Sequence, residues 1–316
     1  MSHAPRHPRR IVLAAAALLL LGTSAGAQTQ PDQPPSTDPR TTEDPRKVAD
    51  PRKVEDPRKV EDPRANAKDP FSGLRGPELY DALYEAGEVG HLRQAFHDQG
   101  WEILGYIDSH CENWLAMHER KLTDTEEGKK QAAELQAKGR SLASMADSAL
   151  ENTRFTNYVN NFYGWTPEQQ VTFREGQKLY RQGASLAQEA KSPQEAQQAM
   201  TPLQQSLTRA RELGDTWGQS MTLSLIGRIQ ADNRQYVDST ATLKEAARLG
   251  REIRDLETVW NGLALLYETA IAQQLYEPAR EALQEQFLLA QEVNDKATAD
   301  KIVQQLVDLD KLFDKG

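Results

Sequence analysis

A repeat with a period of 40 residues in the last third of the chain constrains the fold more than any other feature. The repeated segment reads ARELGD at 210–215, GREIRD at 250–255 and AQEVND at 290–295. Each copy ends on aspartate, a favoured helix N-cap, so each copy predicts the end of one helix and the start of the next. Because a single helical hairpin cannot bury both of its faces, this period is typical of hairpins stacked in series. The sequence therefore predicts an all-α protein with a short α-solenoid over residues 166–316.

Residues 71–165 are predicted to form a helical hairpin domain in front of the repeat. Apolar residues over 89–118 recur at spacings of three, four and seven, which places them on one face of a single long helix. Thr123 to Glu126 has the sequence of a capping box and is expected to start a second long helix, which runs to about Glu151. Further helices are predicted to start at Pro77, to cover Phe155 to Phe162 before Gly164, and to start at Thr166-Pro167.

The first 27 residues have the composition of a secretory signal peptide. Three arginines and no acid precede the apolar run from Ile11 to Leu21, and the small residues Ala25, Gly26 and Ala27 follow it. We expect Sec-type export with cleavage after Ala27, and a periplasmic or secreted bacterial protein. The alternative is an uncleaved anchor that uses the same run, although this run is short for a bilayer.

Residues 28–70 repeat a six-residue unit, best seen in the two copies of DPRKVE that begin at Asp50 and Asp56. Each unit contains a proline, which interrupts helices, and offers a single apolar side chain for burial. Such a segment cannot build a core, so a disordered, semi-stiff tether is predicted. The alternative interpretation is an array recognised by a wall or surface partner.

Composition and charge exclude several classes of function. The formal net charge is −9, and it becomes −12 without the three arginines of the signal peptide. An acidic chain without clustered Lys and Arg is not expected to bind nucleic acid or an anionic lipid surface. No segment after the signal peptide is apolar enough for membrane insertion. The single cysteine, Cys111, allows no intramolecular disulfide.

The residues with chemical potential do not form a recognisable active site. His110, Cys111 and His118 are the one metal-like group, but the two histidines lie two turns apart on one helix and no second cluster completes a site. No glycine-rich phosphate loop or nucleophile motif occurs. We therefore predict no enzyme activity, cofactor or metal. Several aromatic residues could line a ligand groove, although packing of the hairpin against the repeat is the favoured interpretation: Trp101, Trp114, Tyr158, Phe162, Tyr163 and Trp165.

From about residue 168 to 312 the chain resembles the tetratricopeptide family, in a degenerate variant of about 40 residues. The family places small residues where its two helices cross and an aromatic residue at the start of the second helix. The middle copy matches these positions with Gly227, Tyr236, Ser239, Leu243 and Ala246. The third copy keeps Tyr276, Ala279 and Leu283 but has Tyr267 and Gln286 where the family has small residues. The first copy keeps Ala187, Ala199, Leu203 and Ser206 but has Ala196 in place of the aromatic residue. A closing helix is expected over Lys296 to Leu312.

The resemblance implies a groove, lined by the first helix of each hairpin, that binds a protein partner without catalysis. The family's groove positions correspond here to Arg181, Gln188, Lys191, Met221, Arg228, Asp232, Asn261 and Glu268. Their mixed charge suits an extended peptide or a partner helix. The family's Lys and Asn clamp for C-terminal carboxylates is absent. Two alternatives stay open: a spacer without a ligand, and a structural protein that forms a homodimer through the coiled-coil-like hairpin over 89–151.

Overall fold

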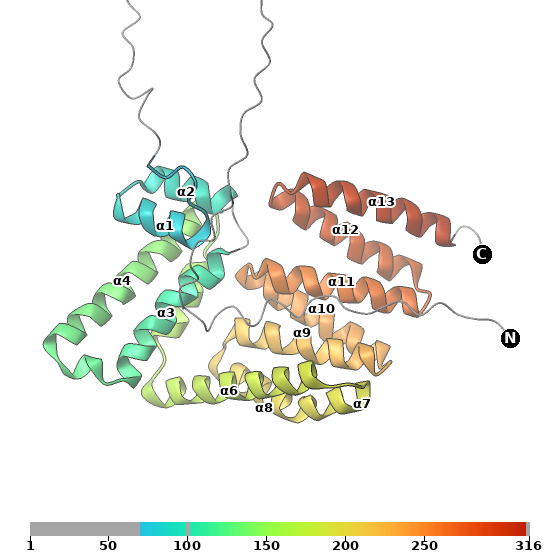
Figure 1. Ribbon diagram of the computed structural model, residues 1–316, viewed down its shortest axis with the longest axis horizontal. Coiled ribbons are helices and arrows are strands. Elements are labelled where there is room, and N and C mark those ends of the chain that lie inside the picture. The colour runs from blue at the N-terminus through green and yellow to red at the C-terminus, as the bar shows by residue number, and fades with distance from the viewer. Residues whose placement is uncertain (1–69, 99–101, 314–316) are drawn as a thin grey trace, which may run out of the picture. The chain divides into compact units, whose positions relative to one another are not determined.

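The computed structural model describes residues 70–98 and 102–313, and all of these except Pro70 belong to one compact unit. Every regular element within these residues is a helix, so the all-α fold class is confirmed (Figure 1). The predicted signal peptide over 1–27 and Trp101 lie outside the described residues, as does the predicted tether over 28–70 apart from Pro70. These interpretations stay predictions.

The first half of the unit contains five α-helices around one core. They are α1 (Gly76–Glu85), α2 (Val89–Asp98), α3 (Ile103–Glu119), α4 (Glu126–Ala149) and α5 (Arg154–Tyr163), with a 3₁₀ turn at Leu122–Asp124. Helices α3 and α4 pack against each other as a hairpin, and α2 and α5 pack against α4. The apolar stripes of these helices meet in one buried cluster that includes Tyr80, Phe96, Ile107 and Leu142.

Two predicted boundaries in this half were wrong. The single long helix expected over 89–118 is divided into α2, which ends at Asp98, and α3, which begins at Ile103. Helix α4 begins two residues later than the start expected at Thr123. The side chain of Thr125 is its N-cap and accepts a hydrogen bond from Gly128 N at 3.0 Å. Periodicity did not reveal the division of the first helix, because the apolar spacing continues from Phe96 to Ile103. The start of the second was misplaced because Thr125, like Thr123, can act as an N-cap.

The second half is a series of helical hairpins. Helix α6 (Pro167–Glu189) pairs with α8 (Met200–Leu213), which it reaches through the short helix α7 (Pro193–Ala196) and a 3₁₀ turn at Gln197–Ala199. Helix α9 (Thr216–Asp232) pairs with α10 (Tyr236–Ile253), and α11 (Leu256–Ala272) with α12 (Tyr276–Glu292). Helix α13 (Lys296–Phe313) then packs against α12. According to their order within each hairpin, we call α6, α9, α11 and α13 the first helices and α8, α10 and α12 the second helices.

The predicted aspartate caps are confirmed at all three repeat positions. Asp215, Asp255 and Asp295 accept hydrogen bonds from the backbone N–H of the third residue that follows, at 2.9, 3.1 and 3.0 Å. These bonds satisfy N–H groups that have no partner within the helix. The 40-residue sequence period therefore coincides with a period in helix starts, at α9, α11 and α13.

A cluster of aromatic rings joins the two halves. Phe162 of α5 contacts the rings of Trp114, Trp165 and Phe173, with centroids 6.5, 4.6 and 5.3 Å away. Phe173 lies on α6, so this cluster connects the hairpin half to the first helix of the repeat. Packing against the repeat, the favoured interpretation of these aromatic residues, is confirmed for Phe162 and Trp165, which contact Phe173, and for Tyr158, which contacts Trp217. Trp114 and Tyr163 contact each other and Phe162 within the hairpin half.

Candidate functional site

Helices α6, α9 and α11 lie side by side. Helix α6 contacts α9, and α9 contacts α11, whereas α8, α10 and α12 make no comparable contacts with one another in the described part of the chain. The indole Nε1 of Trp217 in α9 donates to the Asp255 carboxylate, which caps α11, at 2.9 Å. The exposed sides of α6, α9 and α11, here called the inner face, are therefore neighbours in space (Figure 1).

Seven of the eight predicted groove residues lie on these three helices. Arg181 and Gln188 belong to α6, Met221, Arg228 and Asp232 to α9, and Asn261 and Glu268 to α11. Lys191 follows the end of α6, and its backbone N–H donates to Glu195 in the connection to α8. Met221 is half-buried, and most of the others are more exposed.

The register of the first hairpin differs from the one taken from the 40-residue period. A Cβ atom placed on Gly227 would lie 2.7 Å from Leu243 Cγ, and one placed on Gly183 would lie 2.5 Å from Leu203 Cγ. Gly183, and not Ala187, is therefore the crossing residue of the first hairpin. The connection between α6 and α8 contains Pro193 and two short helical turns, and this longer path displaces α6 by one turn. Gln188 consequently corresponds in register to Asp232.

The side chains of the predicted groove residues have no partner within the described protein. None of the eight makes a side-chain hydrogen bond or ion pair with another residue of ranges 70–98 and 102–313. Several cations of the second helices are paired in contrast, as Arg248 is with Glu245 at 2.7 Å. The polar groups of these eight side chains are therefore free to contact a ligand.

A polar cluster that sequence reasoning missed lies where α3 and α5 meet the repeat. Tyr158 of α5 donates to the Asp108 carboxylate of α3 at 2.5 Å, and its ring contacts Trp217 of α9 edge to face. Arg174 of α6 pairs with Glu112 at 2.5 Å and with Glu119 at 2.6 Å. Burial first, and then the charge of Glu112, raises the pKa of Asp108 to about 8. The sequence carries no signal for this cluster, because Asp108 and Glu112 resemble the acids of any solvated helix.

We predict that Asp108→Asn stabilises the protein at alkaline pH. The pKa of Asp108 in the folded state lies above its ordinary value of 3.8, so the folded state retains a proton that the unfolded state loses. Stability should therefore fall as pH rises from about 4 to 8. Asparagine carries no charge and still accepts the Tyr158 hydrogen bond. We expect a gain on the order of 1–3 kcal/mol at pH 9 and little gain at pH 4, measured by urea unfolding.

The exposed Asp238 supplies a matched control for this substitution. Asp238→Asn removes the same charge from α10 and should shift the unfolding curve by less than about 0.5 kcal/mol at either pH. If Asp108→Asn and the unmodified protein lost stability in parallel between pH 4 and pH 9, Asp108 would be ionised in the folded state.

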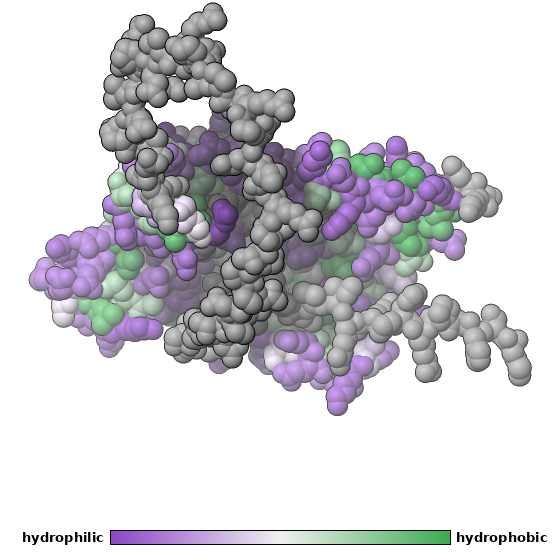
Figure 2. All heavy atoms as spheres, turned by 45° about the horizontal axis from the view of Figure 1, so that its top comes forward, coloured by the Kyte–Doolittle hydropathy of each residue, from purple (hydrophilic) through white to green (hydrophobic). Residues whose placement is uncertain are grey.

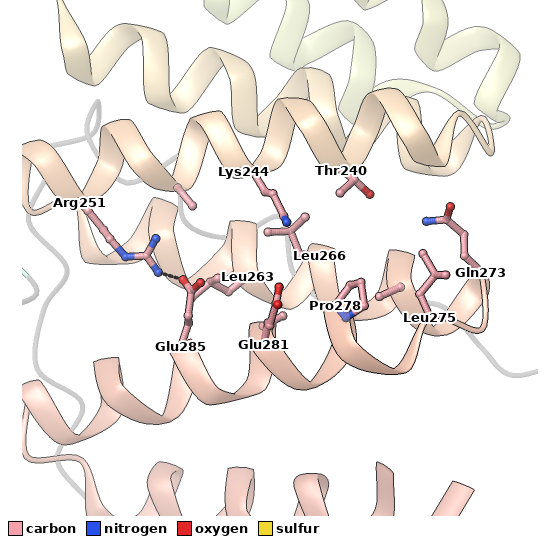
Figure 3. Close-up of a pocket in the computed structure, with 13 residues that line it drawn as sticks. Thr240, Lys244, Arg251, Leu263, Leu266, Gln273, Leu275, Pro278, Glu281 and Glu285 are labelled. Carbon is pink, nitrogen blue, oxygen red and sulfur yellow. Dashed lines mark hydrogen bonds and ion pairs between the residues drawn. The ribbon is translucent and has the colours of Figure 1, made fainter. Parts of the chain in front are cut away.

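A pocket of about 270 Å³ lies on the other side of the array, between α10 and α12. Lys244 and Arg251 of α10 face Glu281 and Glu285 of α12 across a floor of leucines from α11 (Figure 3). Arg251 forms an ion pair with Glu285 at one end of the pocket (Figure 3). The pocket is smaller than most ligand sites, and ionic groups of both signs balance around it. The pocket is the space between α10 and α12 that their side chains leave open.

The histidine and cysteine residues of α3 have different surroundings. His110 and Cys111 are buried, whereas His118 is exposed and its ring is tilted against that of Trp114. Both ring nitrogens of His110 lack a hydrogen-bond partner within the described residues, and burial lowers its pKa. No group of three or more potential metal ligands is found in ranges 70–98 and 102–313.

No protein-family model matches the chain, and a search of the curated proteins gave no significant match. None of the helices in ranges 70–98 and 102–313 combines the length and the apolar character needed to cross a bilayer.

Proposed function

We propose that residues 167–313 form a tetratricopeptide-like array whose inner face binds an extended peptide or a helix of another protein, without catalysis. The observation that carries this proposal is the set of side chains on α6, α9 and α11 that have no partner within the described residues. A spacer without a ligand does not need unpaired side chains of both charges on adjacent helices. Array folds present such surfaces to extended ligands.

The charges of the inner face suggest the chemistry of the ligand. Arg181 of α6 and Arg228 of α9 supply cations, while Asp232 of α9 and Glu268 of α11 supply acids. A ligand with carboxylates toward α6 and α9 and a basic residue toward α11 would complement this arrangement. Because the whole chain is acidic, the basic contacts must act at short range, where pairing is partly desolvated.

We also propose that the protein acts outside the cytoplasm of a bacterium. The arginine-rich start, the apolar run over 11–21 and the small residues before Gln28 support export. The proline-rich repeats over 28–70 would then act as a tether that lets the array reach partners at a distance. Partners are therefore to be sought among envelope or secreted proteins.

We predict that replacing Arg181, Lys191 and Arg228 together by serine weakens partner binding by about tenfold or more. Loss of a partly buried charge pair costs about 2–5 kcal/mol, whereas a contact at the rim costs little. The partner is first isolated by affinity capture from envelope extract with the mature protein as bait. Its dissociation constant is then measured with both proteins, and circular dichroism confirms that helix content is unchanged.

A matched control removes the same charge from the second helices. Arg211 of α8, Lys244 of α10 and Arg280 of α12 are also cations outside the inner face, and their triple serine variant should bind like the unmodified protein. Equal affinity of the inner-face variant, or an equal loss in the control, would show that the inner face is not the binding surface.

A further inference from the structure

Helix α13 begins like the other first helices of the repeat, but within ranges 70–98 and 102–313 no following second helix packs against it. Asp295 caps α13 as Asp215 caps α9 and Asp255 caps α11. Helix α9 then packs against α10, and α11 against α12. Among the described residues, no helix follows α13, and the helix packed closely on it is the preceding α12. The side of α13 that corresponds to the α10-facing side of α9 is therefore uncovered within the described residues.

The 40-residue period identifies the residues of this uncovered face. Leu223 of α9 and Leu263 of α11 are 6% and 2% exposed, in clusters that contain Ala246 of α10 and Ala282 of α12. The corresponding residue of α13 is Val303, which is 46% exposed.

The next turn of the first helices shows the same difference in burial between α9, α11 and α13. Gly227 packs against Leu243 of α10, and Tyr267 is partly buried. Their counterpart Val307 is 42% exposed. Figure 2 shows hydrophobic surface near the C-terminal end of the described chain. Val303 and Val307 thus keep the apolar character of a helix-packing face but lack its cover.

Hydrogen bonds between paired helices support the same register. Ser220 Oγ of α9 donates to Ala246 O of α10 at 2.9 Å, and 40 residues later Gln286 Nε2 of α12 donates to Trp260 O of α11 at 3.4 Å. Asp300 is the third member of the series Ser220, Trp260, Asp300. The face formed by Asp300, Val303, Val307 and Lys311 is therefore the one that first helices present to their second helix; we call it the open face.

We propose that the open face of α13 pairs antiparallel with the open face of a second copy of this chain, giving a two-fold symmetric dimer. The α13 helix of each copy would occupy the place that α10 occupies on α9. Antiparallel packing is the geometry of the hairpins in this array, which are joined by short turns.

The arrangement of side chains on the open face is self-complementary under two-fold symmetry. Val303 and Val307 lie at equal distances on either side of position 305, so an axis at that position places each valine against the other valine of the second copy. The same axis places Asp300 opposite position 310 of the second copy and beside its Lys311, and places Lys311 beside its Asp300. Within one chain Lys311 pairs with Asp308 at 3.2 Å, but both are more than 60% exposed, so this ion pair is weak. Lys311 can therefore pair with Asp300 of the second copy instead.

The test measures the dissociation constant of the dimer by analytical ultracentrifugation of the full mature chain at low ionic strength. We expect a weak dimer, with a dissociation constant on the order of 10–100 μM, because the contact is small. Asp300→Lys and Lys311→Asp should each weaken it about three- to tenfold, since each change creates two like-charge contacts. The double variant should return to within about twofold of the unmodified protein. Val303→Ser combined with Val307→Ser should weaken it at least about tenfold.

Two controls lie on the opposite side of α13. Leu312 is 61% exposed and Lys301 is exposed, and neither belongs to the open face. Leu312→Ser and Lys301→Asp should leave the dissociation constant unchanged. A monomer at every concentration up to about 200 μM would overturn the proposal. So would a dimer that is insensitive to all of the open-face variants, which would point to the hairpin over 89–151 or another surface.

Discussion

Phe162→Ala is expected to lower the free energy of unfolding by about 3–5 kcal/mol, the range found when a large aromatic residue is removed from a packed core. The ring of Phe162 is 1% exposed and lies between Trp114 of α3 and Trp165 and Phe173 at the start of α6. Alanine leaves a cavity that these rigid rings cannot fill. Because the cluster joins the hairpin half to the repeat, the loss should also weaken their coupling. Urea unfolding followed by circular dichroism measures the effect.

Leu312→Ala is the matched control for this cavity. Leu312 is 61% exposed at the end of α13, so its truncation should change the free energy of unfolding by less than about 0.5 kcal/mol. A loss below about 1 kcal/mol for Phe162→Ala would mean that the junction between α5 and α6 is not packed as described.

Gly227→Leu is expected to destabilise the protein by about 1–3 kcal/mol through overpacking at the crossing of α9 and α10. Even a Cβ atom at this position would lie 2.7 Å from the side chain of Leu243, which is fully buried. Gly183→Leu should have a similar effect at the crossing of α6 and α8, because Gly183 makes the same approach to Leu203. Thermal unfolding of the full chain compares the two variants.

Gly90→Leu separates overpacking from the intrinsic effect of glycine in a helix. Gly90 lies on α2 and is exposed, and a Cβ atom added to it would meet no atom of another part of the described chain within 4 Å. Leucine there should be neutral or stabilising by up to about 1 kcal/mol, because glycine is a poor helix former. An unchanged melting temperature for Gly227→Leu would place Gly227 outside a close helix crossing.

The features that the sequence predicts well are those set by local chemistry. The caps at Asp215, Asp255 and Asp295 and the N-cap at Thr166 form as expected, because each depends on a side chain and a backbone N–H within one turn. The aromatic junction follows from the apolar character of its rings.

The features that the sequence does not predict depend on the course of a connection between helices or on contacts between residues that are far apart in the sequence. The one-turn displacement of α6 arises from the connection through Pro193, whose length is visible in sequence but whose path is not. The cluster around Asp108 depends on Tyr158 and Arg174, which are far from it in the chain. Seven of the eight expected groove residues lie on first helices while Lys191 does not, and their role in binding stays a prediction.

Site-specific photo-crosslinking tests the central claim most directly, since it asks which face of the array contacts a partner. A photoreactive phenylalanine derivative replaces Met221 on the inner face of α9 in one protein, and Val237, which is 78% exposed on α10, in another. After irradiation in intact envelopes, the account predicts a discrete crosslinked protein from position 221 and none from position 237. Crosslinks from position 237 alone, or equal crosslinks from both positions, would contradict it.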